Sequence, residues 1–241
     1  MESDRKLNVI QIVYVQQDKD NYRLVRFTGM EHMRAELRSH GIIIGQDVNI
    51  GREVLIADGV TIGSGTRIAS EATLEHGAVI GSNCIIGTDA FIGRNTRLGN
   101  NVSVGNKTEL GRSVIVGDGA ELSSDCIVQD HVHIGHASRL HQMSYVGSES
   151  VLGHHTVIGA ESRLGRMVLA APSTVIDSHR VINSFMSVSG TDGDLRQDEE
   201  LKRQYAMKGW PAFIGGERAQ MGGRQQMPEA EQQKTRRIFG L

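Results

Sequence analysis

Residues 80–93 read IGSNCIIGTDAFIG, and isoleucine returns in this stretch every six positions, at Ile80, Ile86 and Ile92. The same spacing of aliphatic residues extends from Ile44 to Val188 and occupies 25 positions, of which only Ala170 is a weak member. Helices and strands have periods of 3.6 and two residues, so neither explains a period of six. The sequence therefore predicts a structural repeat built from six-residue units.

The composition does not suit an ordinary globular core. Only 4 % of the 241 residues are aromatic, whereas 29 are glycine, so the buried apolar area must come from stacked repeats. The net charge of −2 implies no general attraction to nucleic acid or to a membrane surface. No apolar run approaches the length of a membrane span, and the charged N-terminus is unlike a secretory signal, so we expect a cytoplasmic protein.

Three six-residue units close a triangle, so that one coil takes 18 residues and the inward aliphatic side chains stack in three columns. The next residue is glycine in 15 of the 25 units, and we expect it to supply a corner with unrestricted φ. A small or β-branched residue four positions after the aliphatic lets neighbouring corners pack closely. At the strand spacing of roughly 4.8 Å, about eight coils give a prism on the order of 40 Å long.

The two cysteines, Cys84 and Cys126, both occupy the small-residue position of the repeat. They are 42 residues apart, which is not a whole number of coils, so they should face different sides of the prism. In a cytoplasmic protein we expect both to be reduced thiols within the core.

Residues 42–189 resemble the bacterial hexapeptide-transferase family, whose repeats show this period and phase. The resemblance implies a left-handed parallel β-helix and a homotrimer. The left hand comes from the resemblance alone, because crossovers between parallel strands are ordinarily right-handed.

The two ends of the chain break the repeat. Residues 1–41 are expected to form a cap, with strands at 7–15 and 22–27, a hairpin loop at 17–21 and a helix over 30–40. The cap would cover the open edge of the first coil. Residues 190–241 are expected to form a partly helical extension. Within it, residues 208–215 (KGWPAFIG) resemble the Gly-x-Pro-Ala motif that closes many transferases of this family.

Six of the ten histidines fall between His131 and His155. His136 lies two residues after an inward aliphatic, at an exposed corner, and His154 has the same position one coil later, so the two should stack. His141 lies at the next corner. A neutral imidazole in a groove between subunits is suited to take a proton from a hydroxyl or an amine near pH 7.

The segment His133-Ile134-Gly135-His136 resembles the acyltransferases of the family, in which the second histidine is the general base. The resemblance implies that His136 deprotonates the acceptor, with His154 or His141 assisting. It also implies acyl-CoA or acyl carrier protein as the donor and a hydroxyl or amine, such as that of a sugar nucleotide, as the acceptor.

Two further features belong to this acyltransferase hypothesis. Ala137 replaces the acidic or amide residue that is usual in the family, so Glu149 or Asp130 is assigned to orient the base. The phosphates of the donor are assigned to three basic residues, which are Arg139, Arg163 and Arg166.

Two other hypotheses remain open from the sequence. Gly135 to His141 matches the Gly-His-x-x-x-x-His motif of the γ-class carbonic anhydrases, in which His136 and His141 would bind zinc at a trimer interface. However, Ser123 occupies the place of the third histidine ligand, and a catalytic zinc needs three protein ligands. The third hypothesis is a non-catalytic structural trimer, since no insertion interrupts the repeat from residue 44 to 164 and a fold alone does not determine a function.

Overall fold

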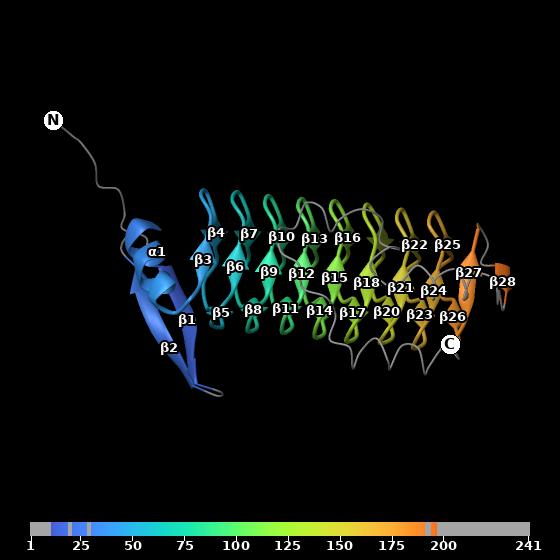
Figure 1. Ribbon diagram of the computed structural model, residues 1–241, viewed down its shortest axis with the longest axis horizontal. Helices are drawn as coiled ribbons and strands as arrows, with labels where there is room; N and C mark the ends of the chain where they lie inside the picture. The colour runs from blue at the N-terminus through green and yellow to red at the C-terminus, as the bar shows by residue number, and fades with distance from the viewer. Residues whose placement is uncertain (1–10, 19–20, 28–29, 191–193, 197–241) are drawn as a thin grey trace, which may run out of the picture.

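The computed structural model describes residues 11–18, 21–27, 30–190 and 194–196. Its main body is a parallel β-solenoid of 25 short strands, from β3 to β27, wound three to a coil (Figure 1). The predicted mainly-β helix of about eight coils is confirmed. Strands one coil apart pair in parallel, as Ile86 does with Ile68 and Val104.

Three sheets run along the solenoid, and we call them sheets A, B and C. The solenoid strands of sheet A are β5 (Val54–Ile56), β8 (Thr73–Leu74), β11 (Phe91–Ile92), β14 (Glu109–Leu110), β17 (Ile127–Val128), β20 (Tyr145–Val146), β23 (Arg163–Leu164) and β26 (Val181–Ile182). Those of sheet B are β3 (Ile43–Ile44), β6 (Thr61–Ile62), β9 (Val79–Ile80), β12 (Arg97–Leu98), β15 (Ile115–Val116), β18 (His133–Ile134), β21 (Val151–Leu152), β24 (Leu169–Ala170) and β27 (Ser187–Ser189). Those of sheet C are β4 (Asn49–Ile50), β7 (Arg67–Ile68), β10 (Ile85–Ile86), β13 (Ser103–Val104), β16 (Glu121–Leu122), β19 (Arg139–Leu140), β22 (Val157–Ile158) and β25 (Val175–Ile176).

A hairpin and a helix lie at the N-terminal end of the solenoid (Figure 1). Strand β1 (Gln11–Asp18) pairs antiparallel with β2 (Asn21–Phe27) and parallel with β5 of the first coil. Helix α1 (Met30–Ser39) follows, and the Arg34 guanidinium donates a hydrogen bond to the carbonyl of Gly45 at 2.9 Å. The hairpin and helix were predicted, although β1 runs further toward the turn than expected, and residues 7–10 lie outside the described ranges.

The core consists of the predicted aliphatic columns. Every member of the series from Ile44 to Val188 is buried, and Leu37 of α1 joins the same cluster at the N-terminal end. Buried hydroxyls link the coils between these columns. Ser138, for example, donates to the carbonyl of Gly153 at 2.9 Å and accepts from the backbone N–H of Thr156 at 3.1 Å. Burial of these hydroxyls is therefore compensated by hydrogen bonds to the neighbouring coil.

The glycine after each aliphatic has a different role from the one predicted. None of these glycines has a positive φ; the left-handed conformation occurs two residues later, as at Asn95 (56°) and Ala137 (49°). A Cβ atom at Gly135 would lie only 2.5 Å from the backbone nitrogen of His154 in the next coil. Glycine is therefore needed for the close approach of successive coils, and not for backbone freedom.

Cys84 and Cys126 are buried and unbonded to each other. Cys84 precedes β10 of sheet C and Cys126 precedes β17 of sheet A, so the prediction of different faces is confirmed. Burial raises the pKa of both thiols, which keeps them protonated and unreactive.

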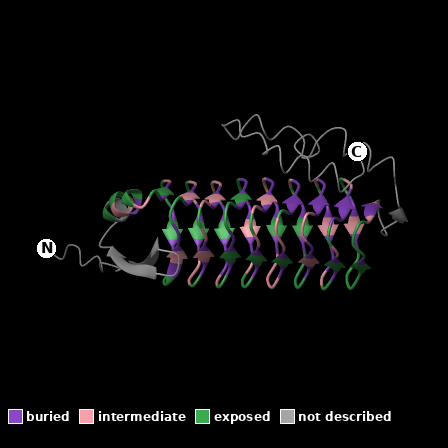
Figure 2. Ribbon diagram, turned by 60° about the horizontal axis from the view of Figure 1, so that its bottom comes forward, coloured by how far each residue is buried: buried purple, intermediate pink, exposed green. Residues whose placement is uncertain are grey.

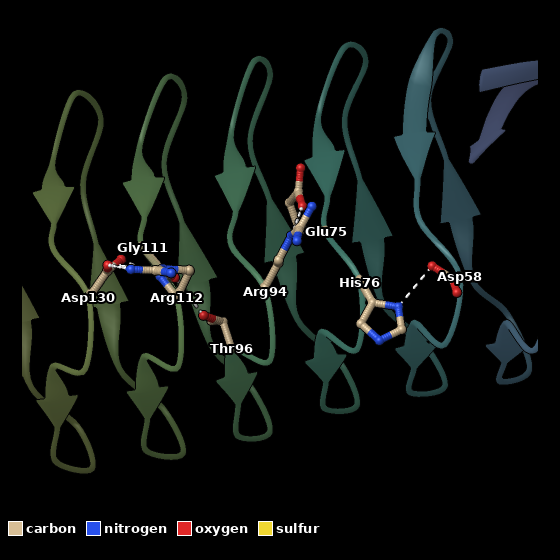
Figure 3. A network of polar contacts seen from close by, with 8 residues as sticks. All are labelled: Asp58, Glu75, His76, Arg94, Thr96, Gly111, Arg112 and Asp130. Carbon is tan, nitrogen blue, oxygen red and sulfur yellow. Dashed lines mark hydrogen bonds and ion pairs between the residues drawn. The ribbon is translucent and has the colours of Figure 1, made fainter. Parts of the chain in front are cut away.

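Charged side chains pair between successive coils along the corner that joins sheets A and B (Figure 3). The pairs in this view are Asp58–His76 at 2.8 Å, Glu75–Arg94 at 3.0 Å and Arg112–Asp130 at 2.7 Å. Most of these side chains are substantially exposed, so each pair adds little to stability.

The C-terminal end departs from the predicted helical extension. Strand β28 (Asp194–Arg196) pairs antiparallel with β27, which otherwise would end sheet B with unpaired backbone groups. The remainder of the extension, including residues 208–215, lies outside the described residues. In the described part of the chain, α1 is too short and too polar to cross a membrane.

Candidate functional site

His136 and His154 occupy the corner between sheets B and C, in successive coils. Their rings stack, with centroids 4.7 Å apart and an angle of 23° between the ring planes. The predicted stacking of these two side chains is confirmed. The close approach depends on Gly117 and Gly135, where any Cβ atom would meet the backbone nitrogens of His136 and His154, respectively.

The hydrogen bond of the His154 ring determines which of its two nitrogen atoms carries the proton. Its Nδ1 atom accepts a hydrogen bond from the backbone N–H of His136 at 3.1 Å. Burial, followed by the proximity of His136 and His155, lowers the pKa of the His154 imidazole. A neutral ring that accepts at Nδ1 carries its proton on Nε2, so His154 offers a hydrogen-bond donor and not a base.

Other residues at this corner position accept the same backbone bond. Ser64 accepts from the N–H of Gln46 at 3.1 Å, and Asn100 accepts from the N–H of Ser82 at 2.9 Å. His154 therefore replaces a small polar side chain in a structural ladder. It keeps the bond and adds an imidazole N–H at the corner.

The structure does not support Asp130 or Glu149 as the group that orients His136. Asp130 precedes β18 and Glu149 precedes β21, so both lie at the A–B corner, whereas His136 follows β18 at the B–C corner. The carboxylate of Asp130 pairs with Arg112, and this contact holds the pKa of Asp130 below its usual value. What lies against the His136 ring is the His154 ring.

His133 and His141 do not join the stacked pair. His133 points outward from β18, and burial lowers its pKa to about 3. His141 follows β19 and is exposed at the corner between sheets C and A. Over the described residues, no three His, Cys, Asp or Glu side chains are grouped so as to hold a metal ion. A zinc site on His136 and His141 would thus have to be completed by another subunit.

The three candidate arginines lie on different sides of the solenoid. Arg139 projects from sheet C and pairs with Glu121 at 3.2 Å. Arg163 projects from sheet A, and the Arg166 guanidinium lies 5.8 Å from the centre of the Phe185 ring at the A–B corner. Within one chain they form no common phosphate site, and only Arg139 is on the strand that follows His136.

Sequence reasoning missed one member of the corner. His155 follows His154 with a left-handed φ of 57°, and its backbone N–H donates to the carbonyl of His136 at 2.9 Å. It is exposed and contributes to the lowered pKa of His154. Its adjacency to His154 in the sequence was the available signal.

The solenoid has three strands to a coil and a buried aliphatic residue every six positions. These features define the class of the protein as a β-helix of hexapeptide repeats, like the transferases that the sequence resembles. A family model described as the GMPPB C-terminal domain matches residues 36–127 and 69–186. These overlapping matches span more than half of the chain, which therefore belongs to this family. None of the curated proteins compared with the chain matches it by sequence.

Solved structures with related folds include several acyltransferases. The acetyltransferase domain of PglB from Neisseria gonorrhoeae, in complex with acetyl coenzyme A, is 27 % identical, with a TM-score of 0.41 over 43 % of this chain. The chain spans about half, 51 %, of that domain. LpxA from Acinetobacter baumannii is 19 % identical, with a TM-score of 0.44, and the alignment covers 70 % of this chain and 79 % of LpxA.

A third structure is the UDP-N-acetylglucosamine acyltransferase from Campylobacter jejuni. It is 18 % identical, with a TM-score of 0.36, and the alignment covers 70 % of this chain and 80 % of that protein. All three TM-scores are below 0.5, so the chemistry proposed below rests on the residues of this chain.

Proposed function

We propose that the protein is an acyltransferase with His136 as its general base. The observation that carries the proposal is the stacked pair, in which His154 is held as a hydrogen-bond donor beside the partly exposed ring of His136. The arrangement offers one imidazole to transfer the proton and a second, neutral imidazole to donate a hydrogen bond beside it.

The reaction would begin when His136 takes the proton from a hydroxyl or amine of the acceptor, such as a sugar nucleotide. The deprotonated atom attacks the thioester carbonyl of acyl-CoA or of an acyl carrier protein. The Nε2–H of His154 or a corner backbone N–H stabilises the oxyanion. The carbon–sulfur bond then breaks, and the protonated His136 returns its proton to the leaving thiolate.

The donor would lie along sheet C, because its strand β19 follows the histidine corner and carries Arg139. Arg139 would exchange its exposed pairing with Glu121 for a phosphate of the donor. Arg163 and Arg166 lie too far around the solenoid to act in the same subunit, so we assign them only to a donor held between subunits.

The proposal includes assembly as a cytoplasmic homotrimer, with the histidine corner of each subunit in a groove against its neighbour. Light scattering at micromolar concentration should give about three times the chain mass of 26.3 kDa. A monomeric mass would remove any site that needs two subunits.

The test compares His136→Gln with the control His131→Gln, in which the exposed histidine lies at the opposite end of β18. Thiol release from acetyl-CoA would be measured with a panel of hydroxyl and amine acceptors. We expect His136→Gln to lose roughly 100-fold or more of the rate, as is usual for a positioned base, and His131→Gln to keep it. An unchanged rate in His136→Gln would refute the assignment.

One observation favours a second candidate, a non-catalytic structural role. The coils run without an inserted loop from β3 to β27, so nothing in this range extends over a neighbouring corner. A correctly assembled protein that neither binds nor cleaves acetyl-CoA or acyl carrier protein would support this role. Metal analysis of the same sample would test the carbonic-anhydrase-like alternative.

A further inference from the structure

An open hollow lies on the outward surface of sheet A, near the C-terminal end of the solenoid. Tyr145, Arg163 and Val181 line it, and these are register partners on β20, β23 and β26 (Figure 1). Because parallel strands lie roughly 4.8 Å apart, the three residues follow one another over about 10 Å. Asn183 and Ser184 line the side at the A–B corner. The volume of about 230 Å³ suits a small ligand.

The outward side chains of the hollow are open to solvent, although the strands that carry them are packed on their inward side. Val181 is 67 % exposed and Arg163 is also exposed, whereas the inward Leu164 and Ile182 are buried. Both kinds of residue, green and purple in Figure 2, are present in the last coils. The exposed valine offers apolar surface that a ligand can cover.

The guanidinium group in the hollow has no carboxylate partner. In the described part of the chain, Arg163 forms neither an ion pair nor a side-chain hydrogen bond, and Glu161 instead pairs with His179 at 3.3 Å. Arg180, whose carbonyl accepts the backbone N–H of Arg163 at 2.8 Å, is also exposed. Other arginines of the solenoid pair with carboxylates, namely Arg94, Arg112 and Arg139. The charge at the hollow therefore favours an anionic ligand.

The side chains of the hollow suit a ligand that has both a phosphate and a flat ring. A guanidinium group binds a phosphate through two parallel N–H groups. The half-buried Tyr145 and the exposed Val181 provide the aromatic and apolar surface against which a nucleobase stacks. Asn183 and Ser184 add an amide and a hydroxyl group, which can bind the hydroxyls of a sugar. Phosphate, sugar and base are the three parts of a nucleotide.

We propose that this hollow binds a mononucleotide, with the phosphate on Arg163 and the base against Tyr145 and Val181. In a triangular coil, sheet A is the side opposite the B–C corner, so the site is separate from His136 of the same chain. The inference does not rest on acyl transfer. Arg163 cannot bind a mononucleotide and the acyl donor of a neighbouring subunit at once, so the two assignments make different predictions.

Isothermal titration calorimetry of the full-length protein with UMP tests the site, because a pyrimidine is the smaller kind of base. We expect Arg163→Gln to weaken the affinity for UMP by roughly 10-fold or more, since the hydrogen bonds between guanidinium and phosphate are lost. The matched control is Arg67→Gln. Arg67 is also exposed and outward, and it lies beside the exposed Ile85, but Asn49 takes the place of the tyrosine. This control should leave the affinity unchanged.

A second variant tests the contact with the base. Tyr145→Leu should weaken the binding of UMP several-fold and leave the binding of inorganic phosphate unchanged, because only the base stacks on the ring. Equal affinity of UMP and inorganic phosphate for the unmodified protein would contradict this part of the proposal.

Two results would overturn the site as a whole. One is an affinity for UMP that is undetectable at millimolar concentration or is the same in Arg163→Gln as in the unmodified protein. The other is an Arg163→Gln variant that loses as much affinity for acetyl-CoA as for UMP, since the hollow would then hold the donor. The thiol-release assay of the His136 variant is a separate measurement, so failure of the proposed acyl transfer leaves this test intact.

Discussion

The inner and outer surfaces of sheet B differ in how they change along the solenoid. On the inner surface, each strand contributes a buried aliphatic residue, from Ile44 in the first coil to Val188 in the last. On the outer surface, Ile43 is 58 % exposed in the first coil, whereas Val151 is 2 % exposed six coils later. The repeat thus requires a buried aliphatic residue at the inward position of every coil. The outward positions are not fixed by the repeat, so their exposure can differ from one part of the solenoid to another.

This difference separates two kinds of constraint. An inward residue must fit among aliphatic neighbours above and below it, so its identity repeats in every coil. An outward residue is constrained only by what lies over it. His154 shows the same principle at a corner, because it satisfies the backbone bond that serine or asparagine satisfies elsewhere and adds a new chemical group.

The largest effect is expected inside the solenoid. Ile86→Asp places an unpaired carboxylate in an aliphatic column, where its burial has no compensating partner, and should cost more than about 4 kcal/mol. Arg94→Ala changes an exposed side chain at the A–B corner after β11, and it should lower the free energy of unfolding by less than about 0.5 kcal/mol. Urea unfolding followed by circular dichroism measures both. Similar midpoints for the two variants would mean that the inward column is wrongly assigned.

The sequence was sufficient for the solenoid because each coil repeats one local rule, and it also placed His136 and His154 in one stack. It did not identify the reason for the glycines, because the distance between coils is a property of the packed structure. Nor did it identify the burial of Val151, because the period of six defines only which residues point inward. The sequence did contain a sign of this burial, because the outward residues of sheet B are uncharged from Ile115 onward apart from His133. The six-residue repeat alone, however, does not predict whether an outward residue is buried.

A smaller effect is expected where two coils touch at the histidine corner. Gly135→Ala places a Cβ atom 2.5 Å from the backbone nitrogen of His154, so the coils must separate at a cost of about 1–3 kcal/mol. The control is Gly119→Asn, because Gly119 has a φ of 66° with open space around it, and Asn101 already occupies this corner one coil earlier. It should change stability by less than about 0.5 kcal/mol. Equal losses of melting temperature would show that backbone conformation, and not coil contact, requires glycine.

The smallest of the three effects is expected at His133, a buried titratable side chain on the outward side of β18. The pKa of His133 is lowered to about 3, mainly by burial and further by the nearby His131, and an unfolded histidine has a pKa of about 6.5. Between these values the unfolded chain binds the additional proton, so stability is complete above pH 6.5 and falls as the pH decreases. The loss should reach about 1.4 kcal/mol at pH 5.5.

His133→Gln isolates this effect, because the variant retains His154, whose pKa is also lowered, and every carboxylate. Urea unfolding of both proteins at pH 7.5 and pH 5.5 gives four free energies. The unmodified protein should lose about 1.4 kcal/mol more than His133→Gln between the two pH values. An identical loss in both would mean that the His133 ring reaches water in the folded protein.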